Sequence, residues 1–170
     1  MTALYLPDVV KDYTETDEVS GKPHRYGCSG IDGTAYGPVF GQSPDSEKKI
    51  MVCYGVYSDV DRTDNDHQVL LQYDVKDWAQ YATIHSQNNL HRNGPEEPEG
   101  KYFVFTGNTS WGVQNLEYDT HSNYWFLACY PGKKPNFANY SLFCVDGSKK
   151  AKVKSLKGVD YQKNGALLTL

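Results

Sequence analysis

The chain has 170 residues, of which 39% are hydrophobic and 22% are charged. This length suits one domain with a substantial core, whereas two separate domains would each be small. The 17 basic and 21 acidic residues give a net charge of -4, and neither sign is concentrated in one region. The composition therefore argues against a nucleic-acid or anionic-membrane surface and favours a small neutral or cationic ligand as partner.

The N-terminal segment MTALYLPDVVKDYTETDE carries no targeting signal that we can identify. It has no basic n-region, and its apolar runs are shorter than a signal-peptide core or a membrane span. We therefore expect the chain as given to be cytoplasmic by default. An extracellular location stays open if a signal peptide has been removed.

Three segments in the first half of the chain have the composition of strands. They are GIDGTAY (30–36), IMVCYG (50–55) and QVLLQYD (68–74). Each is rich in β-branched and aromatic residues and is bounded by Gly, Pro, Asn or Asp. The apolar runs are nearly continuous, which predicts strands covered on both faces. A fourth strand is predicted at WAQYATI (78–84).

The second half repeats this pattern in the same order. GVQNLEY (112–118), FLACYP (126–131) and YSLFCVD (140–146) match the three earlier segments at offsets of 82, 76 and 72 residues. A fourth strand is predicted at AKVKSL (151–156), after a turn at Asp146 and Gly147. KYFVFTG is expected to form one more strand leading into the second copy, and NGALLTL reads as a terminal strand.

These segments predict an all-β fold with little helix, because no stretch shows a long 3.6-residue apolar period. The unit is a four-stranded antiparallel meander present twice, at about 24–84 and 101–156, within a single domain spanning 1–170. Meanders of this kind are typical of β-propeller blades, which stack face to face. The expected architecture is a partial propeller.

A resemblance supports this expectation. The stretches GIDGTAYGPVFG, YGVYSDVDRTDNDHQVLLQYD and TGNTSWGVQNLEYD resemble those of uncharacterised bacterial propeller-like proteins over about residues 24–150. It implies the fold and transfers no catalytic residue. Propellers close with about four to eight blades, so two blades leave open edges. The chain is then a segment of a longer protein, or copies assemble as a homo-oligomer, or the strands form a different sandwich.

The four cysteines occur singly, without a CxxC pair. Cys53, Cys129 and Cys144 lie inside apolar strand-like runs, whereas Cys28 does not. Cysteine in such runs behaves as a small hydrophobic residue, so we expect buried free thiols and give disulfides low weight.

A cluster of four aspartates lies in the turn between the second and third strands of the first copy: Asp59, Asp61, Asp64 and Asp66. The second copy has the cationic stretch GKKPNFAN at this place. Calcium takes oxygen ligands, so this loop is the candidate metal site, although Asp64 stands where an EF-hand loop needs glycine. The alternatives are a solvated turn, in which Arg62 pairs with a neighbouring aspartate, and a catalytic centre.

Two segments that lead into the first strand of each copy are expected to form a common rim. They supply the candidate ligand-binding residues His24, Arg25, Tyr26, Asp32, Asn108, Trp111, Gln114 and Asn115. Polar side chains beside aromatic rings suit a carbohydrate or another polar small molecule. In the alternative, Tyr26 and Trp111 pack between the units, while Asp32 and Asn115 cap strand ends.

Recognisable catalytic motifs are missing from the sequence. It contains no HExxH, P-loop or GxGxxG motif, and GCSG lacks the glycine spacing of a nucleophile elbow. Asp32 and Glu117 form the one carboxylate pair that we can propose for glycoside hydrolysis. The first hypothesis is therefore a non-catalytic ligand-binding or assembly module. A carbohydrate-active or other hydrolase is the alternative, and it rests on analogy of fold.

Overall fold

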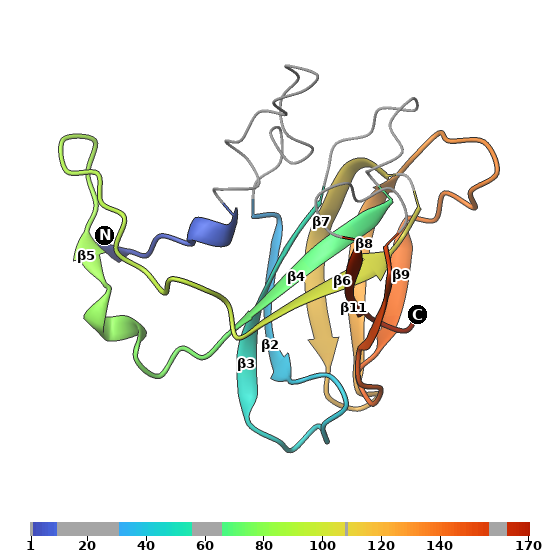
Figure 1. The fold of residues 1–170 in the computed structure, drawn as a ribbon, viewed down its shortest axis with the longest axis horizontal. Helices are drawn as coiled ribbons and strands as arrows, with labels where there is room; N and C mark the ends of the chain where they lie inside the picture. Colours follow the sequence, from blue (N-terminus) through green and yellow to red (C-terminus); the bar gives the residue numbers. More distant parts are fainter. Residues whose placement is uncertain (1, 10–30, 56–65, 108, 157–162) are drawn as a thin grey trace.

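The computed structural model describes residues 2–9, 31–55, 66–107, 109–156 and 163–170, and these parts are almost entirely β-structure (Figure 1). The all-β prediction is confirmed. A single helical turn at residues 7–9 and the 3-10 helix Trp78–Gln80 are the described helical segments. The strands are β1 (Thr2–Ala3), β2 (Gly33–Pro38), β3 (Lys48–Tyr54), β4 (His67–Tyr73), β5 (Thr83–Ile84), β6 (Gly100–Phe105), β7 (Thr109–Asp119), β8 (Tyr124–Pro131), β9 (Leu142–Asp146), β10 (Lys152–Ser155) and β11 (Asn164–Leu167).

The matched segments of the two halves all form strands. β2, β3 and β4 pair antiparallel in that order, and β7, β8 and β9 do the same. Strands close in sequence and joined by turns pair in this way at little entropic cost. The part of each meander that comes from matched sequence is therefore confirmed.

The predicted fourth strands pair differently from the prediction. Residues 78–84 form the 3-10 helix and the two-residue strand β5, which pairs with β1. The Trp78 ring packs on Tyr73, with centroids 5.7 Å apart, so this segment turns over the face of the sheet. The place beside β4 is taken by β6. The four-stranded form of the first meander is thus wrong.

Strand β10 forms where it was predicted, but it does not extend the second meander. It pairs with β11, and β11 pairs parallel with β6. The larger sheet therefore has six strands in the order β10-β11-β6-β4-β3-β2, and the smaller sheet has three, β7-β8-β9. The Asp146 carboxylate accepts hydrogen bonds from Ser148 in the turn after β9, where the chain leaves the smaller sheet.

The two sheets pack face to face as a sandwich, and in Figure 1 β4 and β6 of the larger sheet cross the strands of the smaller one. Their common core centres on Trp125, which is fully buried between the rings of Phe40 and Tyr118. A Cβ on Gly37 would lie 2.3 Å from the Trp125 ring, so only glycine fits there. A sandwich is one of the arrangements that the sequence left open, and the described residues form no closed ring of blades.

The second face of the six-stranded sheet is covered by a different part of the chain. Val9 and Leu6 from the N-terminal segment, together with Trp78, pack on a second core cluster around β3 and β4. All seven residues of β4 are buried as a result, so the prediction of strands covered on both faces is confirmed for β4. In contrast, β8 alternates between buried and accessible positions, because nothing in the described residues covers its outer face.

Two of the cysteines are buried free thiols, as predicted. Cys53 and Cys129 lie in the common core, and burial raises the pKa of the Cys129 thiol to about 12. Burial also raises the pKa of Cys53 well above its usual value. Cys144 is free but only partly buried, and Cys28 lies outside the described residues. Thiols held protonated in this way are poor nucleophiles, so Cys53 and Cys129 act as core residues.

Candidate functional site

The structure describes only some of the residues that the sequence singles out. His24, Arg25, Tyr26 and Asn108 lie outside the described residues, as do Asp59, Asp61 and Asp64. The described candidates are Asp32, Asp66, Trp111, Gln114, Asn115 and Glu117.

The first strands of the two meanders meet, and this brings candidates from both halves together. A Cβ on Gly33 would lie 2.7 Å from the Leu116 nitrogen and 3.0 Å from the Asn115 carbonyl carbon. Asp32, the residue before β2, therefore lies close to the middle of β7. Strand β7 also approaches β3 closely, since Gly112 packs on Gly55 with a positive φ of 70°. The absence of side chains at these glycines allows the close backbone approach.

Strand β7 carries an irregularity that shapes this region. Thr109 pairs with Pro131 and Val113 with Cys129, so β7 advances by four residues over a stretch in which β8 advances by two. Trp111 of β7 and Tyr130 of β8 both lie within this irregular stretch. Such β-bulges redirect side chains locally. Here the Gln114 amide stabilises the bulge by donating hydrogen bonds to the Trp111 and Val113 carbonyls, at 2.9 and 3.3 Å.

A fully buried glutamine holds the bulge from the inner side. The Gln68 Oε1 accepts a hydrogen bond from the Val113 amide at 3.0 Å. Its Nε2 donates to the hydroxyls of Thr106 and Thr109, at 2.9 and 3.3 Å. Gln68 thus connects β4 of one sheet to β7 of the other through a satisfied polar network.

The accessible side of β7 and β8 presents aromatic rings next to amide and carboxylate groups. Trp111 is 53% exposed and Tyr130 is 54% exposed. Asn115 and Glu117 lie on the outer face, paired with Ala128 and Phe126, and Gln114 is exposed at the bulge. We call the following set the β7–β8 surface: Trp111, Gln114, Asn115, Glu117 and Tyr130.

The hairpin turn between β7 and β8 fixes the register of this surface. The Asp119 carboxylate accepts hydrogen bonds from the His121 and Ser122 amides. Asn123 adopts a positive φ of 59°, which asparagine tolerates better than most residues. Its side chain accepts a hydrogen bond from the Tyr118 hydroxyl at 2.9 Å. A side-chain-closed turn of this kind holds the two strands in one alignment.

Asp32 has an unusual electrostatic environment for a residue next to a strand. Its amide donates to the Cys53 carbonyl at 3.1 Å, but its Oδ2 is buried and has no hydrogen-bond partner among the described residues. Burial raises the pKa of this carboxyl to about 6. No contact joins it to the exposed Glu117 within the described residues. Carboxyls with raised pKa values are concentrated at functional sites.

The Asp32→Asn variant should be more stable than the parent at pH 7 and equal to it at pH 4. Burial raises the pKa of Asp32 in the folded state, so its ionisation opposes folding. The free energy of unfolding of the parent is therefore highest below the unfolded pKa of Asp32 and falls as pH rises through about 6. Melting temperatures at the two pH values measure the difference between variant and parent. The exposed Asp77→Asn variant is the control, and a gain that does not depend on pH would contradict the assignment.

The structure places Asp66 in an ion pair and not in an open cluster of carboxylates. Its carboxylate lies 2.7 Å from the Lys134 Nζ, and the two side chains are 10% and 13% exposed. Lys134 belongs to the cationic loop of the second copy, so the two loops that differ most between the copies meet here. Among the described residues, no group of three or more potential ligands could hold a metal ion. In this arrangement Asp66 is paired with Lys134 and is not an open ligand for the calcium ion that the sequence predicted.

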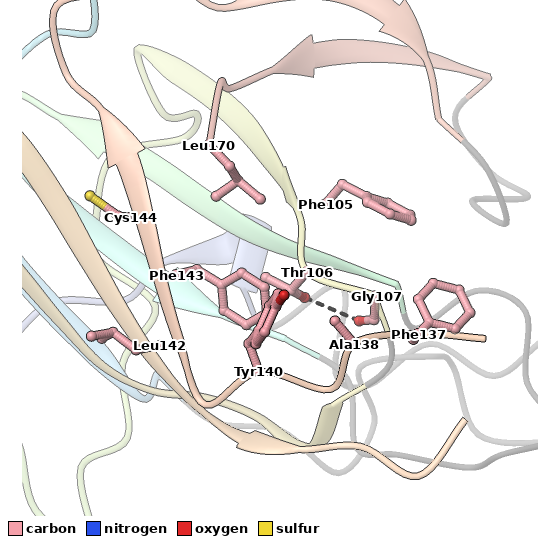
Figure 2. Close-up of a pocket in the computed structure, with 10 residues that line it drawn as sticks. All are labelled: Phe105, Thr106, Gly107, Phe137, Ala138, Tyr140, Leu142, Phe143, Cys144 and Leu170. Carbon is pink, nitrogen blue, oxygen red and sulfur yellow. Dashed lines mark hydrogen bonds between the residues drawn. The ribbon is translucent and has the colours of Figure 1, made fainter. Parts of the chain in front are cut away.

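Sequence reasoning missed a pocket of about 360 Å³ beside β9 (Figure 2). It is lined by Phe105, Thr106, Gly107, Phe137, Ala138, Tyr140, Leu142, Phe143, Cys144 and Leu170. These residues come from the end of β6, the loop before β9, β9 itself and residue 170. No short motif links such distant segments. The one available signal is the aromatic content of the two contributing loops.

No family model, curated protein or solved structure matches the chain in comparisons with known proteins. Among the described residues, no helix has the length and apolar character that a membrane span requires.

Proposed function

We propose that the chain is a non-catalytic binding module and that its β7–β8 surface holds a carbohydrate or a similar polar small molecule. One observation carries this proposal. Trp111 and Tyr130, each more than half exposed, lie on the neighbouring strands β7 and β8 within the irregular stretch of their pairing, and Gln68 and Gln114 hold this stretch in place. A fixed pair of open aromatic rings reduces the ordering cost of binding a flat ligand.

The polar groups beside the rings support a sugar as the ligand. Asn115 and Gln114 offer amide donors and acceptors, and Glu117 offers a carboxylate. Sugars present apolar C–H faces for stacking and hydroxyl groups at their edges, so rings and amides serve both needs. The strand residues on this face include Glu117, Asp119 and Asp146 but no Lys or Arg. That charge pattern favours a neutral or amino sugar over an anionic ligand such as nucleic acid.

The Trp111→Ala and Tyr130→Ala variants should each weaken sugar binding by about tenfold, because one stacking contact is worth roughly 1 to 1.5 kcal/mol. Calorimetric titration against a panel of neutral and amino-sugar oligosaccharides measures the loss. Tyr36→Ala is the matched control, because Tyr36 is 51% exposed but lies on β2 of the other sheet. Equal effects of all three substitutions, or no binding by the parent chain to any member of the panel, would overturn the proposal.

A carbohydrate-active hydrolase is the second candidate, and it draws on a different observation. A carboxyl with a pKa of about 6 keeps part of its population protonated near neutral pH, as a general acid requires. Asp32 would act as that acid, and Glu117 would act as base or nucleophile. Turnover assays on the same panel with Asp32→Asn and Glu117→Gln test it, since an enzyme of this type loses activity with either change.

We also propose that the two meanders are duplicated units of the propeller-blade type, with any further units supplied by the same chain or by other copies. The support is the matched order of β2-β3-β4 and β7-β8-β9. Light scattering on the isolated chain separates a closed assembly from a monomeric sandwich.

A further inference from the structure

Strand β9 is an edge strand, and its open edge can be located from the hydrogen-bond pattern. The Ser141 carbonyl accepts from the Cys129 amide, and the Gly147 amide donates to Asn123. Odd-numbered residues of β9 therefore bond to β8, and even-numbered residues direct their amide and carbonyl groups to the other side. On that side the Asp146 amide donates to the Thr169 carbonyl at 3.0 Å. The amides of Leu142 and Cys144 have no backbone partner in the described parts of the chain.

The pocket lies along this same stretch of edge. Leu142 and Cys144 are among its lining residues, and Tyr140 and Phe143 project toward its centre in Figure 2. The ten lining residues include no charged side chain. An occupant that contacts the open edge thus meets an uncharged, largely aromatic surface.

The six-stranded sheet extends past β9 and leaves part of its inner face uncovered. Val153 pairs with Ala166, and Ala166 pairs with Tyr102, so the three lie in one row. Tyr102 packs on the common core, which places this row on the inner face. Val153 is nevertheless 79% exposed, because the three-stranded sheet ends at β9. One more strand beside β9 would lie over this face.

We infer that β9 accepts an extended, uncharged and apolar peptide segment of a partner protein as a fourth strand, with one of its side chains seated in the pocket. Strand addition of this kind uses unpaired backbone groups for affinity and side-chain pockets for selectivity. The neighbouring Asp146–Thr169 hydrogen bond shows that this edge can pair with another extended segment.

The geometry favours a single strand over a second folded copy of the chain. Two copies joined edge to edge through β9 would place both six-stranded sheets on the same side of the joined sheet. The strands β11 and β10, which extend past β9, would then compete for the same space. A single peptide strand has no second sheet attached to it, so this steric conflict does not arise. The uncharged lining argues against an acidic or basic segment, because burying an unpaired charge is costly.

The capped peptide Ser-Thr-Val-Phe-Val-Thr-Ser is a suitable probe, because it is uncharged, its β-branched residues favour an extended chain, and its apolar residues lie at its centre. The parent protein should bind it saturably in fluorescence polarisation or NMR titration. Two versions serve as matched controls, one N-methylated at both valines and one at both threonines. Since alternate amides of a strand face opposite edges, one version should lose about tenfold in affinity and the other should bind like the parent peptide. Equal binding of both versions would overturn strand pairing and indicate apolar insertion alone.

Protein variants test the same edge from the other side. Cys144→Pro removes only the amide that faces the open edge, and proline is tolerated at such edge positions. It should bind the peptide about tenfold more weakly than Cys144→Ala, which also lacks the thiol but keeps the amide. If Cys144→Pro fails to fold, the methylated peptides still decide the question. Sedimentation that shows a dimer abolished by Leu142→Lys, without peptide binding, would assign the edge to a second copy.

The inference does not rest on the proposed sugar site, and the two can fail separately. Trp111→Ala should leave peptide binding unchanged, because Trp111 lies at the other edge of the three-stranded sheet. Cys144→Ala should leave sugar binding unchanged for the same reason.

Discussion

Replacing Gln68 by leucine should lower the free energy of unfolding by about 3 kcal/mol, since it leaves buried polar groups without partners. The change keeps the approximate volume of the side chain and removes three hydrogen bonds, of which those to Thr109 and Val113 join the two sheets. The buried Val113 amide then loses the Gln68 oxygen as its acceptor. Urea unfolding followed by the fluorescence of the buried Trp125 measures the loss.

Two further variants separate this effect from a general loss of polarity. Gln80→Leu is the control, because Gln80 is exposed at the end of the 3-10 helix, and it should change stability little. Gly55→Ala should act like Gln68→Leu, because a Cβ there would lie 1.7 Å from the Gln68 Oε1. A stable Gln68→Leu protein with an unchanged midpoint would show that Gln68 does not support the bulge.

The buried glutamine connects the core to the proposed binding surface. It accepts a hydrogen bond from the Val113 amide and so supports the bulge in the stretch that carries Trp111. The Gln114 side-chain amide, on the exposed side of β7, supports the same bulge. A polar network of this kind gives a unique geometry to a region that regular pairing would not specify. The geometry of the proposed surface therefore depends on a buried residue that is not part of it.

The strands that were predicted correctly are those whose local sequence decides their state. β3 and β4 are short apolar runs between turn residues, and matched runs recur in β8 and β9. Their partners follow from chain order, because short turns make consecutive strands pair. The same reasoning failed for β10, because its sequence KVKS has one apolar residue and no buried position that would assign it to either sheet. Its pairing with β11 depends on contacts far away in the sequence.

The candidate site was predicted in part for similar reasons. Trp111, Gln114 and Asn115 could be singled out because aromatic and amide residues are adjacent in one segment. Tyr130 could not, since only the pairing of β7 with β8 brings its strand beside that of Trp111. Gln68 carried a visible signal, a polar residue at the start of an apolar run, but its role depends on β7 of the other sheet. The sequence placed Asp66 among carboxylates, whereas the fold pairs it with a lysine 68 residues away.

Replacing Lys134 by methionine should lower the free energy of unfolding by about 3 kcal/mol, because it leaves the nearly buried Asp66 carboxylate without its ion-pair partner. Lys134 is its ion-pair partner, and the Asp66 carbonyl already accepts from the amides of Thr106 and Gly107. Methionine retains most of the apolar stem but also loses the contact of the Lys134 Nζ with the Phe137 ring, 5.2 Å from its centroid. Chemical unfolding at neutral pH measures the loss, and Lys133→Met serves as the exposed neighbouring control.

The double variant Asp66→Asn with Lys134→Met decides whether the charge is responsible. Removing both charges should restore most of the lost stability, because a buried ion pair contributes little beyond what it costs to desolvate. The coupling free energy from the four proteins should then be about 2 kcal/mol. Additive losses would mean that Lys134 and Asp66 contribute independently and that their ion pair does not stabilise the fold. Recovery in the double variant would show that Asp66 and Lys134, which belong to segments at equivalent places in the two copies, are held together by charge.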